Sequence, residues 1–255
     1  MPWLHHMRWP EVEKYLQSRQ LILIPVGSTE QHGRHAPLGT DSFIAIRLAE
    51  DASRETGALV APPLFLGWSP HHMVLPGTIS IDAEVLSNLV FLEIESLAHH
   101  GFARCAIVNG HRITNLSWLQ IAAQRAQSEL DVELALFDPA YMSREIVAEL
   151  GFGPFGHAEE IETSHMLHIH PELVNLEEAV DGSYGDRPLY DIDPRSTKDT
   201  LAYLPSRLSE MQVLASKTGG SSGHPTRARA DLGRQLHEHL VRRLIQVTRQ
   251  LEGLE

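Results

Sequence analysis

Residues 21–33 read Leu-Ile-Leu-Ile-Pro-Val-Gly-Ser-Thr-Glu-Gln-His-Gly, and this segment gives the clearest indication of the fold class. Its first six residues are all apolar, which is typical of a strand buried in a parallel sheet. Gly27 ends the apolar run, and polar side chains follow directly. In open α/β sheets, ligands bind at the carboxyl ends of the strands, so Glu30 and His32 are candidates for a functional site.

Three further apolar runs precede or follow helical stretches along the chain. This alternation predicts an α/β fold with a parallel sheet and crossover helices. Residues 181–225 show little periodicity and are expected to form loops around a short edge element at 212–216. No internal repeat or long linker divides the chain, so residues 1–255 are expected to form a single domain. The predicted strands span residues 21–27, 58–66, 105–108 and 132–137, and the predicted helices span residues 42–55, 83–100, 114–129, 141–150, 159–168 and 231–251.

The composition favours small-molecule or metal chemistry. The chain has 255 residues, with 21 Lys and Arg against 33 Asp and Glu, and its net charge of −12 opposes binding to nucleic-acid phosphates. No apolar stretch approaches the ~18 residues of a membrane span, and the N-terminus lacks the pattern of a signal peptide. Cys105 is the one cysteine, so neither a disulfide nor a cysteine-ligated zinc site can form. We therefore expect a cytoplasmic protein that binds a small molecule and neither nucleic acid nor membrane.

Potential metal ligands follow the first strand. Glu30 and His32 are two residues apart, so in an extended backbone both side chains point to the same face and can hold one ion or two neighbouring ions. Asp41 comes after a loop that can fold back to the same place, just before a predicted helix. An aspartate at such a position commonly caps the helix. Beside the Glu-x-His pair, a role for Asp41 as a metal ligand is favoured over the cap.

Two later segments bring further potential ligands. His111 follows the third strand directly after a glycine, which lets the backbone turn toward the same sheet edge; a solvated turn histidine is the alternative. Residues 157–165 carry three carboxylates and two histidines at the start of a helix. The helix dipole also favours acidic residues there, so a solvated helix start is the alternative for this segment. Other histidines, among them His237 and His239 of the last helix, are expected on the solvated surface.

Together these segments resemble the creatininase (creatinine amidohydrolase) family. The motifs occur in the family's order and cover roughly residues 21–174, with a weaker similarity at 223–226. They are Gly27-Ser28-Thr29-Glu30-Gln31-His32-Gly33, Leu38-Gly39-Thr40-Asp41, His72 with Pro76-Gly77-Thr78-Ile79-Ser80, Asn109-Gly110-His111 with Asn115, and His157-Ala158 with Glu160-Ile161-Glu162-Thr163-Ser164.

The resemblance implies a three-layer α/β/α sandwich with a mostly parallel central sheet, and a hydrolase site with two divalent metal ions. The family's ligands fall on Glu30, His32, Asp41 and His111, with Asp41 at the position that bridges both ions. Zinc is the expected ion, with manganese or iron as alternatives. Family members open cyclic amides, remove formyl groups or trim peptides, and often assemble as hexamers, so a homo-oligomer is expected.

Elementary chemistry agrees with such a site. Two ions that share a carboxylate can also share a water and lower its pKa from about 16 to near 7. The leaving atom must then be protonated. His157 is the candidate for this step, because an imidazole takes up and releases protons near neutral pH.

One position departs from creatininase itself, in which a glutamate two residues after the histidine of Asn-Gly-His is a metal ligand. Here that position is Ile113, which cannot coordinate an ion. The candidate for the missing ligand is Glu162, and Glu160 is the alternative and also a candidate catalytic residue. On a helix these two side chains point about 200° apart, so only one can face the metals.

The substrate pocket is also expected to differ. Many relatives have two glycines after that histidine, whereas Arg112 here places a cation near the site and suggests a substrate with a carboxylate or several hydroxyls. His72 and Trp68 are further candidates for substrate contacts. Creatininase closes over its substrate with tryptophans, but only Trp118 lies in the corresponding interval, so creatinine is not the expected substrate.

These observations predict a metal-dependent hydrolase that cleaves the C–N bond of a small polar cyclic amide or a related C–N bond. Two alternatives remain. The first is a C–C bond hydrolase that opens a cyclic polyol ketone of the inosose type. The second is a metal-binding protein without turnover.

Overall fold

The computed structural model describes residues 3–183, 193–196 and 204–254, and a four-stranded sheet lies at its centre. The strand order is β2-β1-β3-β4, and each neighbouring pair runs parallel. Parallel neighbours require crossover connections, which helices supply here. The strands are β1 (Leu21–Val26), β2 (Leu59–Val60), β3 (Arg104–Asn109) and β4 (Glu133–Phe137).

β1 is buried along its whole length because apolar side chains cover both of its faces. Leu21 and Leu23 belong to one apolar cluster, whereas Ile22 and Ile24 belong to another. Successive residues of a strand point to opposite faces, so one uninterrupted apolar run supplies two cores.

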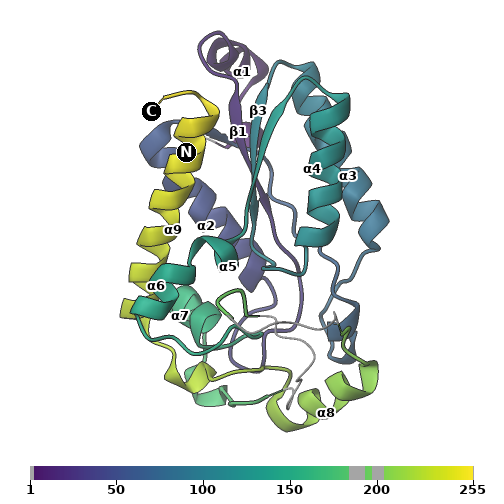
Figure 1. Ribbon diagram of the computed structural model, residues 1–255, viewed down its shortest axis with the longest axis vertical. Coiled ribbons are helices and arrows are strands. Elements are labelled where there is room, and N and C mark those ends of the chain that lie inside the picture. Colours follow the sequence, from purple (N-terminus) through teal and green to yellow (C-terminus); the bar gives the residue numbers. More distant parts are fainter. Residues whose placement is uncertain (1–2, 184–192, 197–203, 255) are drawn as a thin grey trace.

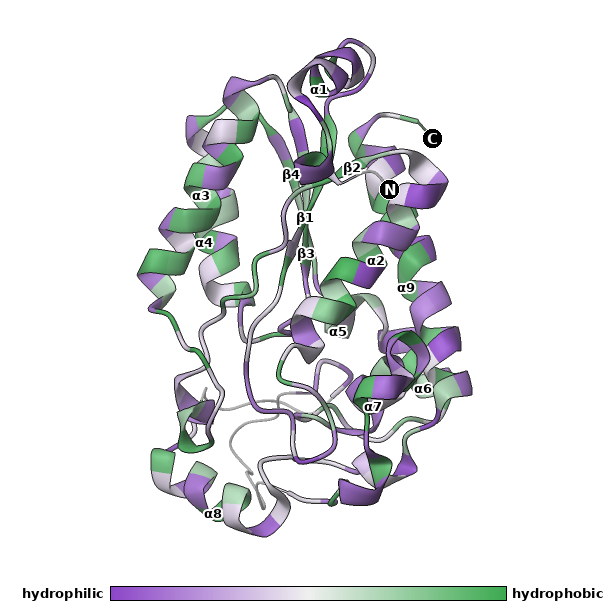
Figure 2. Ribbon diagram, turned by 180° about the vertical axis from the view of Figure 1, so that it is seen from behind, coloured by the Kyte–Doolittle hydropathy of each residue, from purple (hydrophilic) through white to green (hydrophobic). Residues whose placement is uncertain are grey.

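Helices cover the sheet on two sides, as Figures 1 and 2 show from opposite directions. α3 and α4 contact each other on one side, and α9 contacts α2 and α7 on the other. In Figure 2, polar and apolar residues alternate along these helices, as expected where one side is buried and the other solvated. The expected three-layer α/β/α sandwich is therefore confirmed. The bounds are α2 (Thr40–Thr56), α3 (Ala83–His99), α4 (Leu116–Glu129), α7 (Glu160–Ile169) and α9 (Ala230–Leu251).

The second strand is shorter than predicted. Of the predicted strand at 58–66, only Leu59–Val60 pair in the sheet as β2. Pro62 and Pro63 follow, and a proline has no N–H to donate to a strand ladder. After the prolines, Leu64 forms a single parallel bridge with Val26 at the end of β1, and the chain then continues into the long loop that contains the 3-10 helix η2 (Pro70–Val74).

Several helices also differ from the prediction. The edge element predicted at 212–216 is wrong, because this segment lies inside the helix α8 (Leu208–Thr218), which ends at Gly219 with φ of 72°. The remainder of the predicted loop region 181–225 lies partly outside the described residues. One helix predicted at 141–150 is instead two short helices, and an N-terminal helix was not predicted. The remaining helices are η1 (Leu4–His6), α1 (Trp9–Leu16), α5 (Pro139–Met142), α6 (Arg144–Glu149), η3 (Pro171–Leu173), η4 (Leu176–Glu178) and η5 (Pro225–Arg227).

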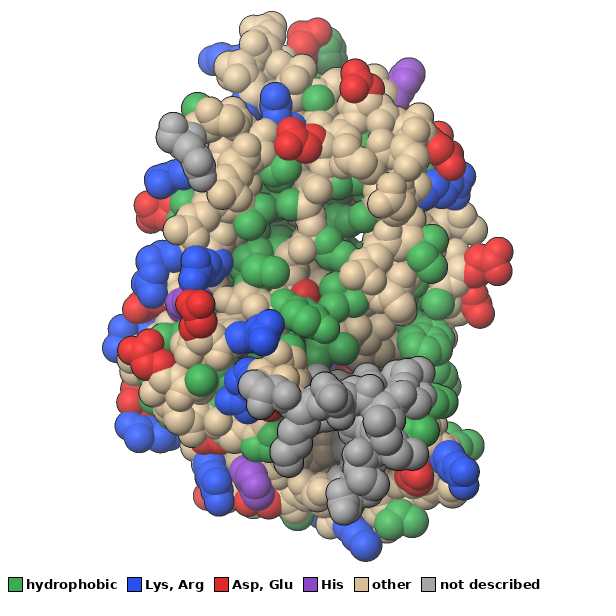
Figure 3. Space-filling model, in the orientation of Figure 1, with side chains coloured by type: hydrophobic (Ala, Val, Ile, Leu, Met, Phe, Trp, Pro, Cys, Tyr) green, Lys and Arg blue, Asp and Glu red, His purple; other side chains and the backbone are tan. Residues whose placement is uncertain are grey.

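The surface carries mixed charge on the face drawn in Figure 3. Lys and Arg side chains alternate there with Asp and Glu along the side formed by α9. Within the described ranges, no helix combines the length and the apolar composition needed to cross a membrane.

Candidate metal centre

The carboxyl ends of β1 and β3 lie side by side, because the two strands pair along their full lengths. The loops that leave these ends gather at the lower end of the sheet in Figure 1. Glu30 and His32 follow β1, and His111 follows β3. Asp41 lies in the first turn of α2 and Glu162 in the first turn of α7. The topology thus brings five predicted site residues to one edge of the sheet.

Gly110 allows the loop after β3 to approach α2 very closely. A Cβ at this position would lie 1.8 Å from the carbonyl oxygen of Asp41, far inside van der Waals contact. The N–H of Gly110 donates to the carbonyl oxygen of Val26 at 2.7 Å, which holds the end of β3 against β1. Only a glycine here lets the next residue, His111, reach Asp41.

Gly110→Ala is expected to destabilise the protein by at least about 3 kcal/mol, because either β3 or the start of α2 must move to admit the methyl group. Gly153→Ala is the matched control, since its Cβ would lie 3.3 Å from the flexible end of Glu160. The control is expected to cost less than about 1 kcal/mol. Urea unfolding measures both values, and equally small losses would contradict the close approach at Gly110.

Asp41 divides its two carboxylate oxygens between two histidines. Oδ1 lies 3.2 Å from Nε2 of His32, and Oδ2 lies 2.9 Å from Nδ1 of His111. Oε1 of Glu30 is 3.4 Å from the same Nδ1 of His111, and Oε2 of Glu162 is 3.8 Å from Nε2 of His32. Three groups of side chains each bring their ligand atoms within 4.8 Å of one another: Glu30, Asp41 and His111; His32, Asp41 and Glu162; and Glu30, His32 and His157.

The side chain of Asp41 is turned toward these histidines rather than toward the N-terminus of α2. The N-cap of α2 is Gly39, and no side chain caps the helix. The hydroxyl of Ser28 donates to Oδ2 of Asp41 at 2.6 Å, which fixes the carboxylate in this orientation. The alternative in which Asp41 caps the helix is therefore wrong.

Several polar atoms of this cluster are buried without a hydrogen-bond partner among the described residues. They are both carboxylate oxygens of Glu30, Nε2 of His32 and Oδ1 of Asp41. Leaving a buried polar atom without a partner costs about 1–3 kcal/mol, so four such atoms in one place require an explanation. Carboxylate and imidazole are the usual protein ligands of divalent ions such as zinc and manganese. The donor set therefore fits a metal site.

Hydrogen bonds define which nitrogen of each imidazole faces the carboxylates. Nδ1–H of His32 donates to the backbone carbonyl of Glu30 at 3.1 Å, so Nε2 is the nitrogen that faces Asp41. In His111 the assignment is reversed, because Nδ1 faces the carboxylates and Nε2 lies 3.4 Å from the hydroxyl of Ser69. A polar partner on the second nitrogen is typical of metal-binding histidines.

In the metal-free chain the carboxylates draw protons onto these histidines. Burial alone would lower the pKa of His32, but the charge of Asp41 outweighs it and raises that pKa to about 10. At His111 the charges of Glu30 and Asp41 likewise outweigh burial and raise the pKa to about 9. Burial also raises the pKa of Glu30. The cluster thus requires positive charge, which divalent ions can supply in place of protons.

His157 lies beside the cluster, and its ring stacks on His72 with 3.9 Å between the centroids. Nε2–H of His157 donates to the carbonyl oxygen of Gln31 at 2.6 Å, which leaves Nδ1 free at 3.5 Å from Oε1 of Glu30. Burial, followed by the charge of His32, holds the pKa of His157 well below its ordinary value. A neutral imidazole with a free nitrogen at this place can accept a proton.

Glu160 and Glu162 point in different directions, as the helical geometry predicts. Glu162 lies in the group with His32 and Asp41. Oε2 of Glu160 instead accepts a hydrogen bond from the N–H of Gly153 at 3.0 Å, and Glu160 belongs to none of the three groups of described residues. Of the two alternatives for the missing ligand, the structure brings Glu162 to the cluster.

The three predicted substrate contacts lie in different environments. His72 is at the cluster, with Nε2 at 3.7 Å from Oε1 of Glu30. Trp68 packs against the apolar cluster under α3 and α4. Arg112 is buried and donates hydrogen bonds to Glu159 and Glu162, so carboxylates of this chain already neutralise the cation that was expected to meet a substrate.

Three polar residues that hold the site in place were not predicted from the sequence. Ser28 orients Asp41, and Gln31 binds both His72 and His157. Both lie inside the first motif, so a search of that motif for hydrogen-bond donors could have found them. Glu159 meets Arg112 across 47 residues, and no local spacing signals such a contact.

Nearly the whole chain is similar to proteins of one family. The family model described as creatinine amidohydrolase matches residues 5–248. The chain is 33% identical over 183 residues to the 3-dehydro-scyllo-inosose hydrolase of Thermotoga maritima, covering 69% of this chain and 58% of that protein, which is less than two thirds of its length. It is 32% identical over 254 residues to the mycofactocin precursor peptide peptidase of Mycolicibacterium smegmatis, covering 92% of this chain and 90% of that protein.

Solved structures agree with this similarity. A crystal structure of creatinine amidohydrolase has a TM-score of 0.78 at 25% identity, covering 98% of this chain and 97% of that chain. A manganese form of creatininase shares the fold with a TM-score of 0.79 at 24% identity, covering 98% of this chain and 98% of that chain. A Zn–Zn form has a TM-score of 0.78 at 24% identity, covering 97% of each chain. Since the family match extends over nearly the whole chain, this protein belongs to the creatininase family of hydrolases.

Proposed function

We propose that this hydrolase works with two divalent metal ions that share the carboxylate of Asp41. Glu30 and His111 complete one ligand set, and His32 and Glu162 complete the other. The position of Asp41 carries the proposal, because its two oxygens face different histidines at 3.2 and 2.9 Å. A carboxylate between two ligand sets is what a bridged two-ion site requires. Zinc is the proposed ion, with manganese or iron as alternatives.

Two such ions would supply a water acidic enough to attack at neutral pH and would polarise the carbonyl of the substrate. His157 is placed to accept a proton at Nδ1 and to return it to the leaving atom. Gln31 fixes the orientation of this ring through its backbone carbonyl, and His72 supports it by stacking. The side-chain amide of Gln31 also donates to Nδ1 of His72 at 2.7 Å, so one residue positions both rings.

The proposed reaction is cleavage of the C–N bond of a small polar cyclic amide, which the family description supports. A second candidate is cleavage of a C–C bond in a cyclic polyol ketone, which the similarity to an inosose hydrolase favours. Creatinine itself is disfavoured. Trp118 is 2% exposed, and its indole N–H donates to Asn115, so this tryptophan packs in the core and cannot close over a substrate.

Product analysis of the metal-loaded protein decides between the two bonds. Lactams and formamides would yield a new amine, whereas a cyclic polyol ketone would yield a ring-opened acid and no amine. Turnover of ketones alone would replace the first candidate with the second. Failure of a protein that carries two ions to turn over any of these compounds would contradict both.

Adding zinc to the metal-free protein at pH 7.5 is expected to release about two protons, because His32 and His111 must each lose one to bind an ion. Their pKa values of about 10 and 9 keep both protonated at that pH. The protons compete with the ions, so metal affinity should rise with pH and fall as the pH drops. Calorimetric titration in two buffers with different ionisation enthalpies counts the protons. His32→Ala should release one fewer, and an unchanged count would contradict its assignment as a ligand.

A further inference from the structure

Arg112 is buried between two carboxylates at the border of the metal centre. Its side chain is 7% exposed, and Nη2 lies 2.8 Å from Oε1 of Glu159. Nε donates to Oε1 of Glu162 at 2.9 Å, and Nη2 lies 2.7 Å from the same oxygen. The ring of Phe155 lies 5.1 Å from the guanidinium carbon. These contacts fix Arg112 in one place and tie the loop after β3 to the start of α7.

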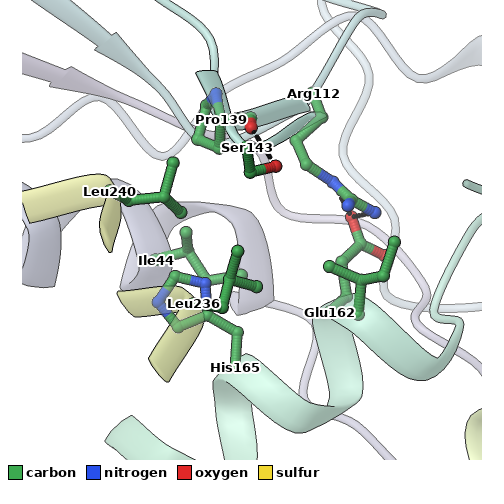
Figure 4. A pocket seen from close by; sticks show the side chains of 9 residues that line it. Ile44, Arg112, Pro139, Ser143, Glu162, His165, Leu236 and Leu240 are labelled. Carbon is green, nitrogen blue, oxygen red and sulfur yellow. Dashed lines mark hydrogen bonds and ion pairs between the residues drawn. The ribbon is translucent and has the colours of Figure 1, made fainter. Parts of the chain in front are cut away.

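Figure 4 shows this pair beside a small pocket. Arg112 and Glu162 meet at one end of the pocket, and Leu236 and Leu240 of α9 lie toward the other end. The pocket has room for about one water molecule. Among the described residues, the guanidinium thus faces Glu162 in this pocket, and the pocket itself is too small for a substrate.

The contacts leave Glu162 with a single oxygen for a metal ion. Oε1 is occupied by Arg112. Oε2 accepts the N–H of Ala158 at 2.7 Å and is the oxygen that lies 3.8 Å from Nε2 of His32. Glu30 in the other ligand set differs, because neither of its oxygens has a hydrogen-bond partner among the described residues. The ligand set of Glu30, Asp41 and His111 can thus offer both oxygens of its glutamate to an ion. The set of His32, Asp41 and Glu162 can offer only one.

We propose that Arg112 restricts Glu162 to one metal-binding oxygen and thereby makes the second position, formed by His32, Asp41 and Glu162, selective for zinc over manganese. Three protein ligand atoms and one water complete the tetrahedral shell that zinc prefers. Manganese prefers six ligands, many of them oxygens, and gains from a glutamate that binds through both oxygens. Arg112 acts through Glu162 and is a positioning residue. The inference rests on the proposed two-ion function.

The test compares zinc and manganese binding at the second position of the metal-depleted full chain. Competition titrations with each ion give the two affinities, and metal analysis gives the number of ions. The double variant Arg112→Met, Glu159→Gln removes a cation and an anion together, so the net charge around Glu162 is unchanged while Oε1 of Glu162 is released. It is expected to lower the zinc-to-manganese affinity ratio of the second position by about tenfold, the scale of effects from residues that hold metal ligands.

Two further variants keep the test decisive. Arg112→Lys retains a cation beside Glu159 but loses the planar fork that holds Oε1 of Glu162, so it should lower the ratio in the same direction even if the double variant does not fold. Arg195→Met is the matched control, because Arg195 lies 5.4 Å from the same Phe155 ring and pairs with Asp193. The control should leave the ratio unchanged.

The outcomes separate this inference from the proposed function. An unchanged ratio in the folded variants, or an equal loss of both metals, would overturn the role of Arg112 while two ions still bind. Binding of fewer than two ions by the unmodified chain would instead overturn the two-ion function itself.

Discussion

Asp41→Asn is expected to remove both metal ions and to lower kcat/KM by roughly four orders of magnitude, because no acidic water is then available at neutral pH. The amide is the same size as the carboxylate and can still accept from the hydroxyl of Ser28. It carries no charge, however, and one of its two oxygen positions becomes an NH₂ group that cannot bind an ion. Both ligand sets contain Asp41, so both should fail together.

Asp82→Asn is the matched control for this variant. Asp82 also lies at the start of a helix, where its side chain accepts the N–H of Glu84 at 2.8 Å and caps α3. Asparagine caps helices about as well as aspartate, so stability, metal content and activity should all be retained. Metal analysis, thermal unfolding and initial rates distinguish the two variants. Loss of only one ion in Asp41→Asn would contradict a shared carboxylate.

The place of the site at one edge of the sheet could be predicted from the sequence. The apolar run of β1 predicts a strand buried on both faces, and the polar residues that follow it must then lie at the carboxyl edge of the sheet. His111 follows β3 in the same way and therefore lies at the same edge. Local patterns therefore predict which residues converge, because a parallel sheet brings the ends of its strands together.

Contacts between distant segments could not be predicted in this way. Arg112 reads as a free cation in the sequence, and only the tertiary structure brings Glu159 and Glu162 to it. His237 was expected at the surface but is buried. Its Nε2 lies 2.9 Å from Oδ2 of Asp51, a residue of α2 that is 186 positions away in the sequence. A hydrogen bond or ion pair with a distant residue offsets the free-energy cost of burying a polar side chain. The hydrophobic periodicity of a single helix does not reveal which distant residue will supply it.

The prediction of an edge element at 212–216 is wrong for a different reason. Sparse periodicity and many glycines around it favoured loops, yet Met211 and Leu214 are three residues apart and both are buried on one side of α8. Spacing of this kind indicates a helix, but a signal of so few residues is weak beside the glycines. Tertiary packing decided the structure of this segment.

His157→Gln is expected to lower kcat by about 10²- to 10⁴-fold while both ions remain bound, which is the usual contribution of a group that transfers a proton. Glutamine can still donate a hydrogen bond to the carbonyl oxygen of Gln31, as Nε2–H of the histidine does at 2.6 Å. It offers no nitrogen that accepts a proton. Because neither set that contains Asp41 includes His157, metal content should not change.

The alternative is that His157 binds an ion, since it also forms a group with Glu30 and His32. In that case the variant would lose an ion together with its activity, so metal analysis separates the two roles. His239→Gln is the matched control, because Nε2 of His239 also lies within hydrogen-bond distance of a backbone carbonyl, that of Met142 at 3.2 Å, but far from the cluster along α9. It should retain both ions and full activity.

The pH profile gives a second, independent measurement. The neutral form of His157 is the one that accepts a proton, so the activity that depends on it is present above its pKa and is lost as the pH falls through that value. Burial is the main cause that holds the pKa of His157 well below that of a free imidazole, and positively charged metal ions beside the ring would act in the same direction as the charge of His32 in the metal-free chain. We therefore expect the acid limb of kcat below neutral pH. The residual activity of His157→Gln should lack this limb. Since the limb belongs to one proton acceptor, its persistence in the variant would assign proton transfer to another residue, and His72, stacked on the same ring, would be the next to test.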